Sequence, residues 1–73
     1  MSAIEIPIRG ATIRLGQLLK LAGIVDSGAE ARGLLAARPA SVNGEPESRR
    51  GRQLHPGDEI RLGDQVLRVT STA

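Results

Sequence analysis

The sequence predicts a small α+β domain in which two short helices pack on a small, mostly antiparallel sheet. Residues 4–8 and 60–69 contain alternating apolar and polar side chains, which is typical of strands with one buried face. Residues 15–38 instead repeat leucine and alanine at intervals of three and four, as amphipathic helices do. Glycine, proline and asparagine separate these segments, at the positions where turns are expected.

Composition limits the possible functions. With 73 residues, the chain has room for a single domain, residues 1–73. It has no cysteine and one histidine, which excludes disulfides and thiolate zinc sites, and we predict neither a metal nor a cofactor. It contains no Phe, Tyr or Trp, so the core must be aliphatic and aromatic stacking on bases is excluded. No segment has the pattern of a membrane helix or a secretory signal, and we expect a cytoplasmic protein without membrane contact.

The N-terminal segment predicts an edge strand followed by a turn. Residues 4–8 alternate isoleucine with other residues, and Pro7 cannot donate a hydrogen bond to a neighbouring strand, which favours an edge position. After a turn, residues 12–14 are expected to form a brief return strand.

Two helices are expected next. The first covers residues 15–22 and contains Gly16, which costs up to about 1 kcal/mol relative to alanine inside a helix. A close approach of another backbone segment would explain this glycine. The second helix begins with a capping box, in which Ser27 caps the helix and Glu30 reaches back to it. Pro39 ends the helix, because it disfavours helical geometry in the preceding residue.

The second half of the chain predicts turns and a hairpin. Residues 40–44 indicate a strand that enters a tight Asn-Gly turn. Residues 45–52 are polar, contain proline and glycine, and are expected to form a loop. At the C-terminal end, residues 63–64 predict a two-residue turn that places Ile60 opposite Leu67.

The positive charge is concentrated in the middle of the chain. The net charge is only +2, but residues 9–52 contain eight cations and four anions, which gives +4. Nine of the ten cations are arginines, whose planar fork suits phosphate. Arg14, Gln17 and Lys20 are spaced three apart on the side of the first helix opposite its leucines. Residues 49–52 add a dense basic loop, and the sequence as a whole predicts a polyanionic partner.

Four motifs in order resemble the S4 RNA-binding domain family. They are Arg14-Leu15 followed by Leu18-Leu19, Ser27-Gly28-Ala29-Glu30-Ala31-Arg32, Val42-Asn43-Gly44, and Gly57-Asp58-Glu59-Ile60. The resemblance covers residues 12–62, and the chain looks closest to the small stand-alone bacterial S4-like proteins. One departure is Gly28, because S4 domains often have arginine after the capping serine.

The resemblance implies a fold and a function. The fold would be the two-helix S4-like motif, also called alpha-L, packed on the sheet. The function would be binding of structured RNA, ribosomal or transfer RNA, by a ribosome-associated, non-enzymatic and monomeric protein. The candidate RNA-binding residues are Arg14, Gln17, Lys20, Ser27, Gly28, Arg32, Asn43, Arg49, Arg50 and Arg52. Replacing the three loop arginines together with alanine is expected to weaken RNA binding and to leave the fold intact.

Other interpretations of the same residues remain open. The basic helix face could be an ordinary solvated surface, and the loop arginines could pair with Glu45 and Glu47. Ser27 is in the first place a helix cap, and Asn43 a turn residue. The basic patch could instead serve a protein-interaction adaptor or a DNA-binding module. An enzyme is the least favoured class, because no Ser/His/Asp set, carboxylate pair or phosphate-binding glycine loop is found.

Overall fold

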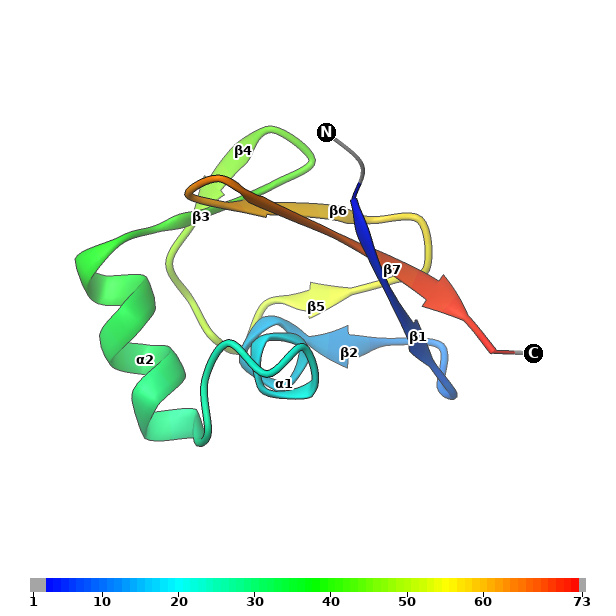
Figure 1. The fold of residues 1–73 in the computed structure, drawn as a ribbon, viewed down its shortest axis with the longest axis horizontal. Helices are drawn as coiled ribbons and strands as arrows, with labels where there is room; N and C mark the ends of the chain where they lie inside the picture. Colours follow the sequence, from blue (N-terminus) through cyan, green and yellow to red (C-terminus); the bar gives the residue numbers. More distant parts are fainter. Residues whose placement is uncertain (1–2, 73) are drawn as a thin grey trace.

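The computed structural model describes residues 3–72 and confirms the α+β class. Its elements are β1 (Ile4–Ile8), β2 (Ile13–Arg14), α1 (Leu15–Leu21), α2 (Gly28–Ala37), β3 (Ala40–Val42), β4 (Glu45–Glu47), β5 (Gln53–Leu54), β6 (Glu59–Leu62) and β7 (Gln65–Ser71) (Figure 1). Five strands form one sheet in the order β1-β7-β6-β3-β4, and β2 pairs with β5 in a separate ladder. Neither helix in the described range is long and apolar enough to cross a bilayer.

The main sheet is antiparallel except at one edge. β1 runs parallel to β7, whereas the other neighbours are antiparallel. The edge position predicted for the first strand is confirmed, since β1 has a neighbour on one side only. The C-terminal hairpin also has the predicted register, with Ile60 opposite Leu67, and Gly63 in its turn has a φ of 61°.

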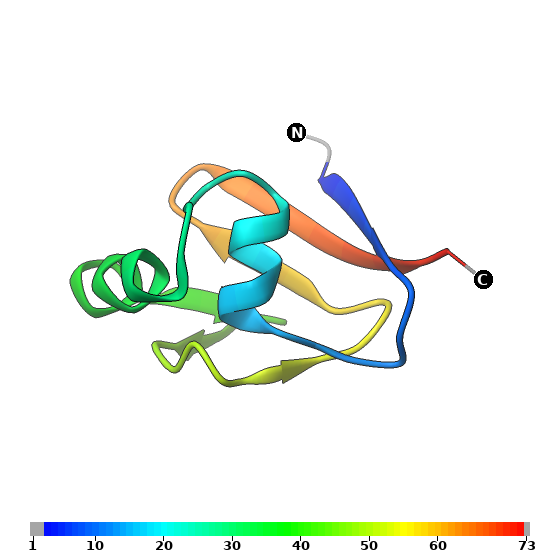
Figure 2. The same cartoon turned by 90° about the horizontal axis from the view of Figure 1, so that it is seen from below.

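The core lies between the main sheet and the two helices, and in Figure 2 α1 crosses in front of the sheet. Alternate residues of β6 and β7 point into the core. Among them are the cross-strand partners Ile60 and Leu67, which are both fully buried. Leu18 and Leu19 of α1 and Leu35 of α2 are fully buried against it. The apolar residues that recur with strand and helix periodicity therefore face the core, as expected, and the opposite sides of the helices are exposed.

Two strand predictions were wrong. Ile13 and Arg14 of the predicted segment 12–14 do form a short strand, but β2 does not return along β1. Ile13 pairs with Leu54 of β5 instead. Residues 45–52 are a loop only in their second part, because β4 pairs with β3 over three residues. Pro46 is compatible with a strand there, since β4 is the last strand of the sheet and one of its sides needs no hydrogen bonds.

The ends of α2 follow local rules with one difference. The Ser27 hydroxyl accepts a hydrogen bond from the Glu30 N–H at 3.1 Å, as predicted for the cap. The Glu30 carboxylate, however, accepts from the N–H of Asp26 at 3.2 Å, one residue before the expected partner. Arg38 is extended, with φ −147°, as the following Pro39 favours, and the helix ends there.

Candidate nucleic-acid interface

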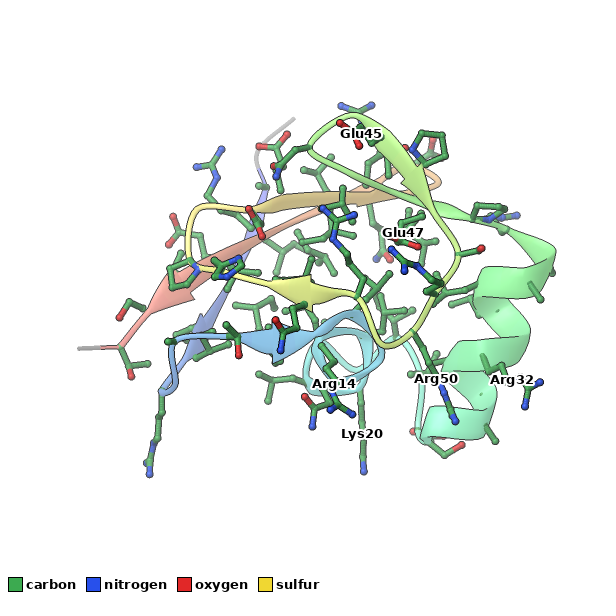
Figure 3. All side chains as sticks on the ribbon, turned by 180° about the vertical axis from the view of Figure 1, so that it is seen from behind. Arg14, Lys20, Arg32, Glu45, Glu47 and Arg50 are labelled. Carbon is green, nitrogen blue, oxygen red and sulfur yellow. The ribbon has the colours of Figure 1, made fainter. Side chains whose placement is uncertain are left out.

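A shallow concavity of about 300 Å³ lies between α1, the start of α2 and the loop of residues 48–52. It is lined by Arg14, Gly16, Gln17, Lys20, Gly28, Arg50 and Gly51. Five of these residues were predicted from the sequence as RNA-binding residues. Figure 3 shows the labelled Arg14, Lys20 and Arg50 side chains on the helix side of the molecule, away from Glu45.

The loop is attached to the first turn of α1 by backbone hydrogen bonds. The Leu15 N–H donates to the Arg52 carbonyl at 2.9 Å, and the Gly16 N–H donates to the Arg50 carbonyl at 2.8 Å. The Gln17 side-chain oxygen accepts from the Arg14 N–H at 3.2 Å. The first N–H groups of a helix have no partner within the helix, so the loop carbonyls supply what the helix itself lacks. This pairing fixes the position of the loop relative to α1.

Gly16 is explained by the same contact. A Cβ atom at this position would lie 3.2 Å from the Arg50 Cβ and 3.4 Å from the Arg50 carbonyl oxygen. The close backbone approach expected from the sequence therefore exists, and it comes from the loop more than thirty residues further along the chain. Neither Gly16 nor Gly51 was among the residues predicted for the site, and the only signal for Gly16 was its unfavourable place inside a helix.

The cations that line this concavity lack an anionic partner among residues 3–72. Among the described residues, no carboxylate forms an ion pair with Arg14, Lys20, Arg32 or Arg50. Arg32 does not line the concavity, but Figure 3 shows it on the outer side of α2, on the same side of the molecule. Three other cations, Arg9, Arg38 and Arg61, also lack an ion pair in the described range, and none of them lines the concavity. The helix side thus carries an uncompensated group of positive charges.

Two of the three loop arginines, in contrast, share one buried carboxylate as an ion-pair partner. Glu47 is only 7% exposed and lies opposite Ala40 of β3, on the inward side of the sheet. The Arg49 Nε lies 3.1 Å from Glu47 Oε2, and the Arg52 Nη1 lies 3.0 Å from Oε1. Pairing of the loop arginines with Glu47, which the sequence left open, is therefore found for Arg49 and Arg52. In residues 3–72 Glu45 forms no ion pair.

These contacts hold Glu47 in its charged form. Hydrogen bonds from the Arg49 side chain, then from the Arg49 N–H and the Arg52 side chain, lower the pKa of Glu47 from 4.5 to about 2. The opposing effect of burial is smaller. Replacing all three loop arginines with alanine would leave this buried carboxylate with the residue-49 N–H but without either cation. The structure therefore predicts that such a variant loses stability as well as RNA affinity.

The lowered pKa predicts a loss of stability in acid. The unfolded chain binds a proton at Glu47 near pH 4.5 and the folded chain only near pH 2. The free energy of unfolding should therefore fall as the pH is lowered from about 4.5 to about 2. Glu47→Gln removes this titration, and its urea-unfolding free energy should depend less on pH in that window. An equal dependence in both proteins would show that the Glu47 cluster does not contribute.

The Asn43 side chain forms hydrogen bonds within the protein. Its φ of 52° and that of Gly44, 88°, form the predicted tight turn between β3 and β4. Its side-chain nitrogen donates to Asp58 at 3.0 Å, and its side-chain oxygen accepts from the Glu59 N–H at 2.9 Å. Burial raises the pKa of Asp58, but hydrogen bonds from the His55 N–H and the Asn43 amide lower it more. Asn43 thus links the turn to the segment before β6 and does not line the concavity.

A second, more open depression adjoins the first at Gly51. It is lined by Arg49, Gly51, Arg52, Gln53, His55 and Asp58. Its two arginines form ion pairs with Glu47, and the Asp58 carboxylate also lines it, so its positive charge is partly offset. Residues 3–72 contain no group of three or more His, Cys, Asp or Glu side chains placed to hold a metal ion.

The predicted site residues therefore fall into three groups. Arg14, Gln17, Lys20, Gly28 and Arg50 share one concavity, with Arg32 on the adjacent helix face. Arg49 and Arg52 lie in the neighbouring depression with their charges paired. Ser27 and Asn43 have side chains engaged in a helix cap and a turn.

Comparison with known proteins identifies the family. The family described as "S4 domain" matches residues 6–70. The chain is also 46% identical over 50 residues to a Bacillus subtilis (strain 168) protein named "Probable ribosome maturation protein RlbA", an alignment that covers 68% of this chain and 70% of the relative. The family match over residues 6–70 spans both helices, the loop of residues 48–52 and most of the sheet, and it confirms the resemblance found in the sequence motifs. The chain belongs to the S4 domain family.

Proposed function

We propose that this protein binds structured RNA, with ribosomal RNA as its target, through the helix-pair surface. We use this name for Arg14, Gln17, Lys20, Gly28, Arg32 and Arg50. The observation that carries the proposal is the contrast between the cations of this surface, which lack ion pairs in the described range, and Arg49 and Arg52, which have them. Membership of the S4 domain family and the similarity to a probable ribosome maturation protein support the same function.

The chemistry of the surface suits an RNA backbone. An A-form helix offers phosphates and 2′-hydroxyls along a wide, shallow minor groove and hides its base edges in the deep major groove. Guanidinium groups bind phosphate in a bidentate manner, and Gln17 adds an amide that can donate to a hydroxyl. Because the loop is hydrogen-bonded to α1, the spacing of Arg14 and Arg50 is set before RNA arrives, which favours recognition of shape.

The remaining predicted residues have a lesser part in the proposal. Arg49 keeps 77% of its side chain exposed despite its ion pair, so it remains a possible second contact at the edge of the surface. Arg52, Ser27 and Asn43 act mainly by holding the loop, the start of α2 and the β3–β4 turn in place. We further propose that the protein works in the cytoplasm as a non-catalytic binding protein.

The proposal predicts a steep salt dependence. Four cations that each neutralise one phosphate should give a slope of log affinity against log salt of about −3 to −4. Fluorescence anisotropy titrations of a labelled ribosomal RNA hairpin at several salt concentrations would measure it. Replacing Arg14 with alanine should reduce the slope by about one unit.

Two further titrations separate the proposal from its rivals. A DNA duplex of the same length and sequence should bind more weakly than the RNA hairpin, because B-form geometry places its phosphates differently. Equal affinity for both would favour a DNA-binding module, and an acidic protein that binds more tightly than the RNA would favour an adaptor. Crosslinking in cells, followed by sequencing of the bound nucleic acid, would identify the RNA.

A further inference from the structure

The Arg50 side chain lies across the junction of the two helices, where two glycines leave room for it. On α1, Gly16 allows the Arg50 backbone to approach within hydrogen-bond distance. On α2, a Cβ atom at Gly28 would lie 3.1 Å from Nη1 of the Arg50 guanidinium, closer than ordinary van der Waals contact. Arg50 therefore contacts both helices, its main chain at the first and its guanidinium at the second.

The main chain of Arg50 is held on both sides. Its carbonyl accepts from the Gly16 N–H at 2.8 Å, and the neighbouring Arg52 carbonyl accepts from the Leu15 N–H at 2.9 Å. The residue before it, Arg49, is tied to Glu47 through its backbone N–H at 3.0 Å as well as through its side chain. The Arg50 side chain itself forms no ion pair with a described residue. The loop thus fixes the base of this side chain and leaves its charge available.

We propose that Arg50 is the central phosphate contact of the helix-pair surface and that Gly28 is a positioning residue for it. This inference rests on the proposed RNA-binding function and deepens it. A long arginine side chain ordinarily loses much rotational freedom when it binds. Packing beside Gly28 restricts the guanidinium before RNA arrives, so less freedom is lost on binding. The absence of a side chain at position 28 is then a requirement of the site, and not merely a tolerated feature of a helix start.

Gly28→Ala tests the inference without removing any charge. The added methyl group meets only the far end of a flexible side chain, so the guanidinium should move while the fold remains. Gly33→Ala is a matched control, because it makes the same change in the same helix and a Cβ there has nothing within 4 Å. Both changes favour the helix, since alanine is a better helix former than glycine.

The expected results are differences in RNA affinity at one salt concentration. Arg50→Ala should weaken binding about tenfold, Gly28→Ala about three- to tenfold, and Gly33→Ala less than about twofold. The decisive comparison is the double variant Gly28→Ala/Arg50→Ala, which should bind no more weakly than Arg50→Ala alone, because Gly28 acts only through Arg50. Additive losses in the double variant would overturn the positioning role. Thermal unfolding by circular dichroism, run on every variant, would show that the fold is retained.

Arg50→Lys tests the same inference without altering a glycine. An ammonium group lacks the planar fork and should lose about threefold or more in affinity, whereas an unchanged affinity would overturn the central role of Arg50. Failure of the inference is distinguishable from failure of the proposed function. If Arg14→Ala and Arg50→Ala both weaken binding but Gly28→Ala equals Gly33→Ala, only the positioning role fails. If neither arginine change alters RNA binding, the helix-pair surface itself is wrong.

Discussion

Reversing the charges of Arg14 and Lys20 together, with glutamate at both positions, is expected to lower RNA affinity on the order of 1000-fold. The change removes two cations from the helix-pair surface and places two carboxylates where phosphates would approach. Each like-charge contact adds repulsion to the loss of a favourable contact. Anisotropy titration of the ribosomal RNA hairpin at fixed salt would measure the effect. The fold should be retained, because both side chains are exposed and neither forms an ion pair with a described residue.

A matched control separates a local site from the effect of net charge. Arg38→Glu/Arg61→Glu makes the same change in total charge with two exposed residues that do not line the concavity. Arg61 alternates with the buried Ile60 and Leu62 in β6 and so faces away from the helices. We expect this control to lose no more than about tenfold, through weakened long-range attraction alone. Equal losses in the two double variants would reject a localised RNA-binding surface.

Leu35→Ala is expected to destabilise the fold severely. Leu35 is fully buried and anchors α2 to the sheet. Removing such a side chain typically costs about 2–5 kcal/mol through lost burial and the cavity left behind. A domain of this size has roughly 3–5 kcal/mol of net stability, so the variant should be largely unfolded at 25 °C. Urea unfolding followed by circular dichroism would show a weak transition or none.

Leu21→Ala provides the comparison for this prediction. The substitution is chemically identical, but Leu21 is 58% exposed at the end of α1. Its effect on the free energy of unfolding should stay within about 0.5 kcal/mol. A loss in Leu21→Ala as large as that in Leu35→Ala would mean that the burial pattern described for the helices does not govern stability.

The parts of the fold that local rules determine were predictable from the sequence. Pro7 placed the first strand at an edge, and the apolar alternation fixed which residues of the last hairpin face one another. The ends of α2 followed from Ser27 and Pro39, which act on their immediate neighbours. In each case, the residues responsible lie within a few positions of the structure they specify.

Pairings between distant segments were not predictable in the same way. The two-residue ladder of β2 and β5 joins Ile13 to Leu54, and a strand of that length has no periodicity of its own. The polar composition of residues 45–52, with Pro46 and Gly51, predicted a loop where β4 forms. Only the edge position of β4 makes the proline compatible with a strand. Gly16 signalled a close approach, but its partner Arg50 could be identified only from the folded chain.

The candidate site likewise combines features that neighbouring residues determine with features that depend on distant segments. The spacing of Arg14, Gln17 and Lys20 along one helix predicted that they share a surface, and they do line one concavity. The sequence did not distinguish the loop arginines from one another, yet Glu47 forms ion pairs with two of them. Which cation remains available depends on the side of β4 from which the carboxylate projects. The sequence could not predict that orientation, because its composition indicated a loop at residues 45–52.

The parallel pairing of β1 with β7 has a consequence for biosynthesis. Ile4 lies beside Leu67 and Ile8 beside Ser71, so the first strand of the described residues pairs with the last. Such long-range pairing raises the contact order and slows folding. The nascent chain should hold β1 unpaired until β7 has emerged from the exit tunnel. Completion of the sheet is therefore expected to be a late step in folding.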